Sequence, residues 1–410
     1  MSTETAADQP GAFATTEPQE SPLTRLWENV KGGNLGSAPV IGALTIIVVV
    51  FSFTAQNFFT AVNFINIITQ MAGLTMLAFG VVFVLLLGEI DLSIAYVSAI
   101  AGLVAAELQK PDSGHFLPGV WPIVIALIVT AAIGVGQGSI VALIGVPSFV
   151  VTLAGLLIWQ GVVQLGLGAG GPIIIENNWI NDTASYFLSD TAGWVLAGVI
   201  SLLYVGTIVG SVVSKRRHGV AIPYPWVLAL KAIAVPALAF LFVAICNHDR
   251  GVPVSGLAIL LFLIFWTFVA KRTTFGRHVY ATGGNAEAAR RAGIIVPRIR
   301  ILVFMISGLM AGVGGIILAG NLRSVAPDQG GGTLLLDAIS AAVIGGVSLF
   351  GGRGEVRAAV LGAAMIATIE NGLFIFGFQP GVIFITTGSI LLAAVTLDTI
   401  ARRRQMKTGR

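Results

Sequence analysis

Apolar residues recur along this chain in runs long enough to cross a lipid bilayer. A transmembrane helix needs about 20 mainly apolar residues, and two of the runs, 92–108 and 335–350, are short and rich in Ala, Gly and Ser. We expect half-helices or re-entrant segments at these two. The pattern predicts an all-α, polytopic transmembrane helical bundle with twelve hydrophobic segments, at 38–56, 65–87, 92–108, 119–144, 148–168, 191–213, 225–246, 252–270, 299–320, 335–350, 356–378 and 382–400.

Polar residues flank the predicted bundle and divide the chain into three parts. Residues 1–37 are rich in Thr, Glu, Pro and Gly. They lack a charged start followed by an apolar stretch, which predicts a disordered cytoplasmic tail and no signal peptide. Residues 38–400 are the predicted transmembrane domain, and 401–410 are a basic cytoplasmic tail.

The basic residues predict the orientation in the membrane. If the N-terminus is cytoplasmic and the segments alternate, only Lys110, Arg250 and Arg323 of the 23 Lys and Arg residues fall in outside loops, and Lys231 lies within a segment. Cytoplasmic loops of membrane proteins carry an excess of Lys and Arg. We therefore expect a multi-pass protein of the bacterial inner membrane with both termini in the cytoplasm.

Composition excludes several classes of function. Charged residues make up 10% of the chain, against about 25% in soluble proteins, and the positive-inside pattern explains the pI of 9.4 without a nucleic acid partner. The single cysteine, Cys246, leaves no intrachain disulfide or CxxC site. Because no catalytic triad or metal-ligand spacing occurs, we expect no catalytic residue and no metal site.

The predicted cytoplasmic segment 271–298 has the sequence pattern of a short capped helix. Asn285 can cap its first turn, Glu287 and Arg290 suit its positive and negative ends, and Gly293 can close it in a left-handed conformation. Such a thin helix is suited to enter a cleft in another protein. The alternative is an ordinary basic loop that only obeys the positive-inside rule.

Four separated stretches resemble the bacterial ABC-importer permeases for monosaccharides, the ribose, arabinose, galactose and xylose branch. They are "GEIDLS" (88–93), "VPSFVVTLAGLLIWQG" (146–161), "FGRHVYATGGNAEAARRAGI" (275–294) and "LLDAISAAVIGGVSLFGG" (335–352). The resemblance runs from about residue 40 to 400. It implies a permease subunit that forms the membrane pathway for a monosaccharide.

The resemblance also implies partners and site residues. In that family segment 271–298 docks onto a separate cytoplasmic ATPase, which uses ATP and Mg²⁺, so this chain needs no cofactor of its own. A sugar-binding protein delivers the sugar, and two permease copies pair within the membrane lipid. The implied coupling residues are Gly276, Arg277, Gly283, Gly284, Asn285, Glu287, Ala288, Ala289 and Gly293, and the family-motif residues are Gly88, Glu89, Asp91, Ser93, Gly345, Gly346, Gly351 and Gly352.

Two features resemble the xylose permeases within this family. Glu89 occupies a position where ribose-type permeases have Gly, and residues 212–250 supply an extra stretch whose removal would leave ten segments. The sugar is therefore expected to be D-xylose or a related pentose.

Polar residues inside the apolar segments are candidates for the pathway, because such groups normally face a cavity or a partner. Asn63, Asn66 and Gln70 share one helix face, as do Gln160 and Gln164, and Glu370 and Asn371 lie within another segment. Carboxamides and carboxylates provide the hydrogen-bond partners that sugar hydroxyls need. The alternative role for these residues is hydrogen bonding between helices.

Two other classes of function remain open. A proton-coupled secondary transporter would use Glu89, Asp91, Glu370 and Asp398 as proton carriers, but it leaves the capped cytoplasmic helix unexplained. A membrane scaffold without transport leaves the polar helix faces unexplained.

A first prediction concerns nucleotide binding. The chain contains no Gly-Lys dipeptide and hence no GxxxxGK[ST] phosphate loop, so the purified chain should not bind ATP. Titration with a fluorescent ATP analogue checks this, and saturable binding that unlabelled ATP displaces would contradict it.

Overall fold

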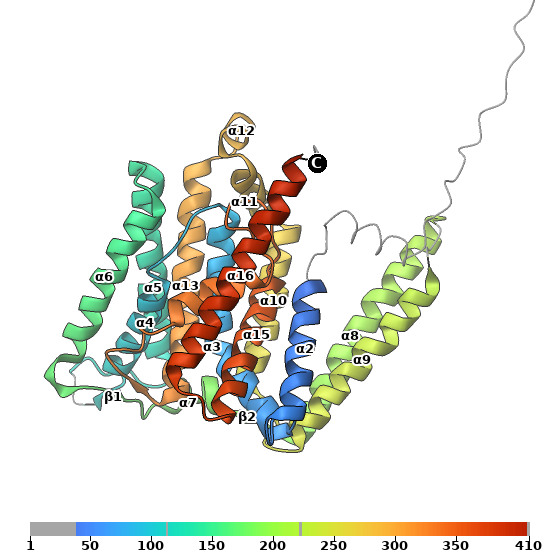
Figure 1. Ribbon diagram of the computed structural model, residues 1–410, viewed down its shortest axis with the longest axis horizontal. Coiled ribbons are helices and arrows are strands. Elements are labelled where there is room, and N and C mark those ends of the chain that lie inside the picture. Colours follow the sequence, from blue (N-terminus) through green and yellow to red (C-terminus); the bar gives the residue numbers. More distant parts are fainter. Residues whose placement is uncertain (1–37, 112–113, 221–223, 408–410) are drawn as a thin grey trace, which may run out of the picture.

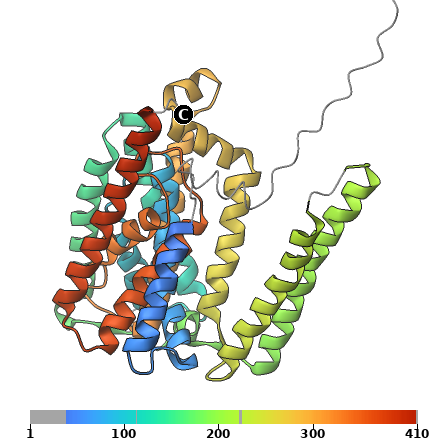
Figure 2. The ribbon, with the colours of Figure 1, turned by 45° about the vertical axis from the view of Figure 1, so that its right-hand side comes forward.

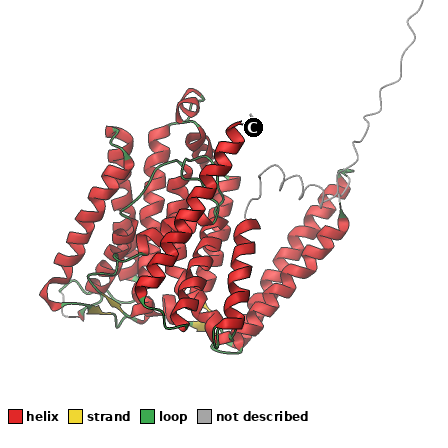
Figure 3. Cartoon of the chain, viewed as in Figure 1, coloured by secondary structure: helices red, strands yellow, loops and turns green. Residues whose placement is uncertain are grey.

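The computed structural model describes residues 38–111, 114–220 and 224–407 as an almost wholly helical bundle (Figure 3). Each of the twelve hydrophobic segments contains a helix. These helices are α2 (Ala38–Thr54), α3 (Ala61–Leu86), α4 (Ile94–Leu108), α5 (Trp121–Ser139), α6 (Ser148–Leu167), α8 (Asp190–Arg217), α9 (Pro225–Asn247), α10 (Val254–Arg272), α13 (Val296–Leu322), α14 (Leu334–Ile344), α15 (Arg357–Ile375) and α16 (Pro380–Lys407).

The all-α class is confirmed, but twelve full spans are not. Among the described residues, eight helices are long and apolar enough to cross a membrane, while α2, α4, α14 and the apolar part of α16 are shorter. Helix α14 has 11 residues, which makes it about 16 Å long. Because the apolar layer of a bilayer is about 30 Å thick, α14 is a half-helix.

Short elements mark the two ends of the bundle (Figure 1). At one end, which we call the ladder end, β1 (Ile173–Ile174) pairs with β4 (Ser324–Val325), and β2 (Phe187–Leu188) pairs with β3 (Val252–Pro253). The same end carries α7 (Asn178–Ser185) and a short turn at Gly168–Gly170, whereas η2 (Ile140–Ile144) continues α5 toward the opposite end. At that opposite end, which we call the α12 end, lie α11 (Thr274–Gly284) and α12 (Ala286–Arg291).

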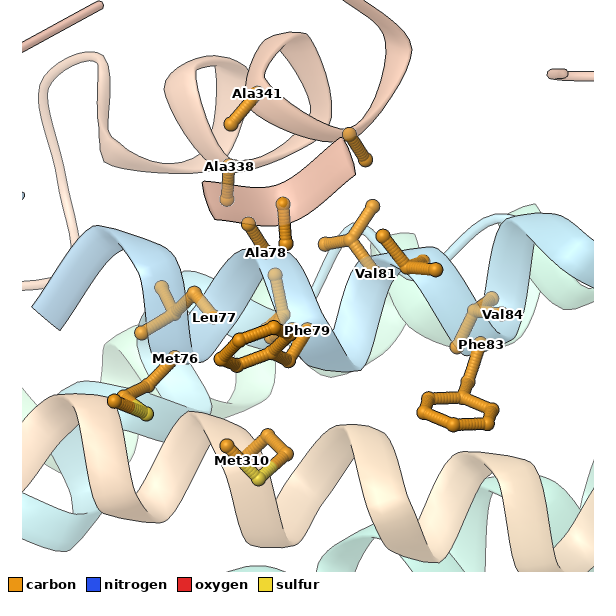
Figure 4. Close-up of a cluster of buried hydrophobic side chains, with 14 of the residues drawn as sticks. Met76, Leu77, Ala78, Phe79, Val81, Phe83, Val84, Met310, Ala338 and Ala341 are labelled. Atoms are coloured by element: carbon orange, nitrogen blue, oxygen red, sulfur yellow. The ribbon is translucent and has the colours of Figure 1, made fainter. Parts of the chain in front are cut away.

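Helices α3 and α13 form the centre of the bundle. Helix α3 is buried without a break from Met71 to Leu86, and it lies between α13 and α14 (Figure 4). Phe79 and Met310 are fully buried in this core. A helix that is apolar all round is suited to such a position, because every face contacts another helix.

Glycines allow α13 to approach its neighbours closely. A β-carbon on Gly308 would collide with the carbonyl oxygen of Thr130 in α5, and one on Gly315 would collide with that of Ser98 in α4. Without a hydrophobic driving force between helices in lipid, such small-residue contacts are a main source of helix association.

Basic residues are unevenly divided between the two ends of the bundle. The last turn of α8 carries Lys215, Arg216 and Arg217, and the last turn of α10 carries Lys271 and Arg272; both turns lie at the α12 end. The positive-inside rule predicts that this end is cytoplasmic. The predicted tails fall largely outside the description, which covers neither 1–37 nor the side chains of 401–410.

Helices α8 and α9 form a hairpin that leans away from the bundle (Figure 2). They contact each other along their length, and a cluster that includes Ala197, Val243 and Cys246 joins the hairpin to the ladder end of the bundle. The predicted inserted segment 212–250 contains α9 but only the end of α8. The structural unit is therefore the whole α8–α9 hairpin. If one of these two antiparallel helices were removed, the chain that follows would cross the membrane in the opposite direction.

The packing of α13 gives a second prediction. Gly308→Ala should destabilise the folded protein by about 1–3 kcal/mol, because the new methyl group has no space beside Thr130. Thermal unfolding in detergent measures this. Gly136→Ala is the matched control, since Gly136 has no neighbour within 4 Å of an added β-carbon. Equal melting temperatures for the two variants would contradict the close contact.

Candidate functional site

The segment at the α12 end is built as its sequence predicts. Thr273 precedes α11, and its hydroxyl accepts a hydrogen bond from the Gly276 amide at 3.2 Å. Asn285 precedes α12, and its side-chain oxygen accepts a hydrogen bond from the Ala288 amide at 2.9 Å. Gly293 has a φ of +87°. Local hydrogen bonds therefore define both ends of α12.

Salt bridges stabilise the exposed side of α12. The Glu287 carboxylate pairs with Arg290 and with Arg291. The hydrogen bond and charge of Arg290 lower the pKa of Glu287, so that this residue stays ionised. Both arginines suit the negative end of the helix.

The residues of α12 divide into an inner and an outer face. Ala289 is 4% exposed and lies against the chain itself, whereas Ala288 and Ala292 are exposed. Ile295, just after the helix, exposes 63% of its surface. Of the two alanines predicted for coupling, only Ala288 presents surface to a partner, and Ala289 supports the helix from beneath.

Five glycines pack backbone against backbone beneath α12, and we call them the glycine junction: Gly88, Gly283, Gly284, Gly351 and Gly352. The Gly352 amide donates a hydrogen bond to the Leu86 carbonyl at 2.8 Å. A β-carbon on Gly283 would collide with the same carbonyl, and one on Gly351 would lie 2.8 Å from the Gly283 oxygen. Gly88, Gly351 and Gly352 also have positive φ angles, which favour glycine. Three of the stretches that carry the family resemblance thus meet at one point.

Side chains reinforce the junction. The Tyr280 hydroxyl of α11 donates a hydrogen bond to the Gly354 carbonyl at 2.8 Å. Burial, together with the nearby Glu355 carboxylate, raises the pKa of Tyr280, so the hydroxyl keeps its proton. Lys271 pairs with Glu355 at 2.8 Å. Neither Tyr280 nor Glu355 was among the predicted site residues. The sequence did offer a signal for Glu355, because it is a charged residue that follows a run of glycines.

The acidic residues of "GEIDLS" are held in place by α13. The buried Asp91 carboxylate accepts hydrogen bonds from the Ser93 and Ser307 hydroxyls, both at 2.7 Å. Glu89 pairs with Arg300 at 3.0 Å. These contacts give Glu89, Asp91 and Ser93 a structural role. The sequence offered only a weak signal for Ser307, a hydroxyl among glycines and apolar residues.

Gly345 and Gly346 shape the exit from α14. A β-carbon on Gly345 would collide with the Ala358 carbonyl at the start of α15, and Gly346 has a φ of +104°. The chain can therefore leave the half-helix and run to the glycine junction before α15 begins.

Three of the predicted pathway residues meet in one hollow. Gln70 of α3 and Glu370 and Asn371 of α15 line a cavity of about 340 Å³ together with Phe374 and Ile383. Glu370 lies near the end of α15, and Gln70 lies in the first half of α3. The hollow is therefore closer to the ladder end than to the middle of the bundle.

The other polar residues lie elsewhere. Asn63 is buried, and its amide donates a hydrogen bond to the Phe58 carbonyl at 2.9 Å, which stabilises the turn before α3. Asn66 accepts a hydrogen bond from Arg250 at 2.6 Å. Gln160 and Gln164 lie on α6, which packs on α4 and α5. None of these four residues lines the hollow. The Asn63 side chain forms its hydrogen bond within the protein instead.

Asp337 was missed by the sequence analysis. It lies in the first turn of α14 and is 5% exposed, and α14 packs against α15, the helix that carries Glu370. The signal was present, since the apolar segment 335–350 contains one charged residue, and charges in such segments mark functional sites.

Comparisons with known proteins identify the family of the chain. Residues 63–397 match the family described as branched-chain amino acid transport system / permease component. The xylose transport system permease protein XylH of Escherichia coli (strain K12) is 34% identical over 93% of this chain and 96% of its own length. The XylH protein of Haemophilus influenzae is 32% identical over 92% of this chain and 99% of its own.

A ribose permease is also similar. The ribose import permease protein RbsC of Escherichia coli (strain K12) is 31% identical over 87% of this chain and 91% of its own length. No solved structure matches the chain. The chain therefore belongs to this permease family and, within it, to the monosaccharide permeases of ABC transporters.

Proposed function

We propose that this chain is the membrane subunit of an ATP-driven importer for D-xylose or a related pentose. The observation that carries the proposal is the glycine junction. It joins the α11–α12 segment to two turns that contain family-motif residues, 86–93 and 345–356, which we call the motif turns. The similarity to XylH over nearly the whole length supports the choice of sugar.

A separate ATPase would supply the energy. It would use ATP and Mg²⁺ and dock on the outer face of α12, around Ala288, Ala292 and Ile295, where small and apolar residues are exposed beside two arginines. Backbone contacts without intervening side chains are stiff, because packed interiors compress little. A displacement of α12 would therefore move the turns at 86–93 and 345–356 with it.

The sugar would enter from the ladder end. In the predicted orientation this end faces outward, so an extracytoplasmic binding protein would deliver the sugar there, and two copies of the chain would form the pathway. The hollow at Gln70, Glu370 and Asn371 supports this direction, because it lies toward the ladder end.

A proton-coupled transporter is the weaker alternative. Of its four proposed carriers, Glu89 is paired with Arg300 and Asp91 accepts hydrogen bonds from two serines. The Asp398 side chain lies outside the described residues. Of the carriers whose side chains are described, only Glu370 lines a cavity.

The docking face gives a third prediction. Ala288→Trp should abolish co-purification of the ATPase while leaving the folded yield of the permease unchanged, because the ring would protrude from the outer face of α12 into the partner. Pull-down of the partner ATPase with the tagged permease measures this. Arg217→Trp at the exposed end of α8 is the control, and equal recovery of the ATPase by both variants would contradict docking at α12.

The glycine junction gives a fourth prediction. Gly283→Ala should uncouple the importer, so that the ATPase still binds but sugar-stimulated hydrolysis and uptake fall by about tenfold or more, as expected from an overpacked contact. Gly284→Ala is a matched control on the neighbouring residue, because a β-carbon there meets nothing within 4 Å. Normal uptake by Gly283→Ala would show that the junction does not transmit motion.

A further inference from the structure

Two buried side-chain oxygens on the packed helices α14 and α15 lack hydrogen-bond partners among the described residues. Asn371 lines the hollow and is 7% exposed, and among the described residues its Oδ1 has no hydrogen-bond partner. Oδ1 of Asp337 also has no hydrogen-bond partner among the described residues, although the carboxylate of this residue accepts a hydrogen bond from the Thr333 hydroxyl. Leaving a buried polar atom unpaired costs free energy, so such atoms at a cavity mark a place where a ligand completes the hydrogen bonding.

Among the described residues, neither Asp337 nor Glu370 forms an ion pair with a basic side chain. Helices α3 and α14 contain no Lys or Arg, and in α15 the one basic residue is Arg357, at the opposite end from Glu370. Asp337 and Glu370 therefore lie on two helices that pack against each other, and neither carboxylate is compensated by a basic residue of these helices. Charged groups placed in this way inside a membrane protein are costly and are kept for function.

The lining favours a neutral polyol. Hydroxyl groups of a sugar can donate to the Asp337 and Glu370 carboxylates and to the Asn371 oxygen, while the Gln70 amide can both donate and accept. The Phe374 ring, which exposes 76% of its surface, offers an apolar face to the C–H groups of the sugar. The cavity of about 340 Å³ lies at the lower end of the range for small-molecule sites, about 300–1,000 Å³.

Helix α14 runs from the turn that carries Asp337 to the loop of the glycine junction. Its first turn carries Asp337, and its last residue, Ile344, leads through Gly345 and Gly346 into the loop that packs against Gly283. A half-helix whose ends rest on two different sites can shift as a unit, because its chain is not tied into a full span.

We propose that Asp337, Glu370 and Asn371 form a subsite that binds the hydroxyl groups of the transported sugar, and that α14 connects this subsite to the ATPase docking segment. Asp337 is the member of this subsite to which the sequence analysis assigned no role, although it lies in the stretch 335–352. The inference rests on the proposed function, since it takes a monosaccharide as the ligand.

The first test uses cells that carry the complete importer. Asp337→Asn keeps the shape of the side chain but replaces one acceptor oxygen with a donor. Uptake of labelled D-xylose should fall by about tenfold or more, as for the loss of a hydrogen bond to a charged group, while ATPase co-purification stays at the wild-type level. Asp190→Asn, at the exposed start of α8, is the matched control and should transport normally.

The second test does not depend on that variant folding. In a Cys246→Ser background, Phe374→Cys places a single thiol in the hollow of the full-length chain. Millimolar D-xylose should slow its reaction with a maleimide, whereas D-xylose should not protect Phe53→Cys, which replaces an 88% exposed residue of α2. Slowing by NaCl without sugar would instead indicate a cation site and overturn the proposal.

The outcomes separate the two proposals. If the wild-type importer takes up neither D-xylose nor D-ribose, the proposed function itself is wrong. If the wild type transports D-xylose and Asp337→Asn does so equally well, or if D-xylose fails to protect Phe374→Cys, the proposed function stands and the subsite is wrong.

Discussion

Close approach of backbone to backbone is the constraint on which this structure depends. In the core, α13 crosses α5 and α4 at glycines that leave no room for a β-carbon, and at the α12 end Gly283 lies directly against the Leu86 carbonyl. In lipid, helices gain little from burying apolar side chains against each other, so close packing and hydrogen bonds must hold them together. The same contacts that stabilise the bundle therefore bring the α11–α12 segment against the motif turns.

The half-helix α14 has a second role within this closely packed bundle. It is too short to cross a bilayer, and it packs on α3 and α15 within the bundle. Its first turn carries a buried carboxylate, and the loop after its last turn contacts the coupling segment. Broken helices of this kind are where transporters place their binding groups, because irregular backbone is tolerated only inside the protein or beside a cavity. The position of Asp337 fits this physical rule.

Ion pairs at the α12 end play a different part. Those of Glu287 lie on an exposed surface, where such pairs contribute little to stability, and they serve mainly to keep a short helix ordered. The pair of Lys271 with Glu355 and the hydrogen bond from Tyr280 to Gly354 instead join separate segments. The α11–α12 segment is thus locally ordered by its own sequence and fixed to the membrane domain by contacts from distant residues.

The sequence by itself determined the position of every long helix, the caps of α12 and the family, because these depend on residues within a few positions or on length and composition. It did not determine which side of each helix faces which neighbour, since the second half of α3 and most of α13 are apolar all round and a uniform pattern marks no face. Only the tertiary structure placed Ala289 inward, engaged Asn63 in a turn, and brought Gln70 and Glu370 together in one hollow. Those contacts join residues far apart in the chain, and they arise from the rotation and crossing of whole helices, which no local pattern encodes.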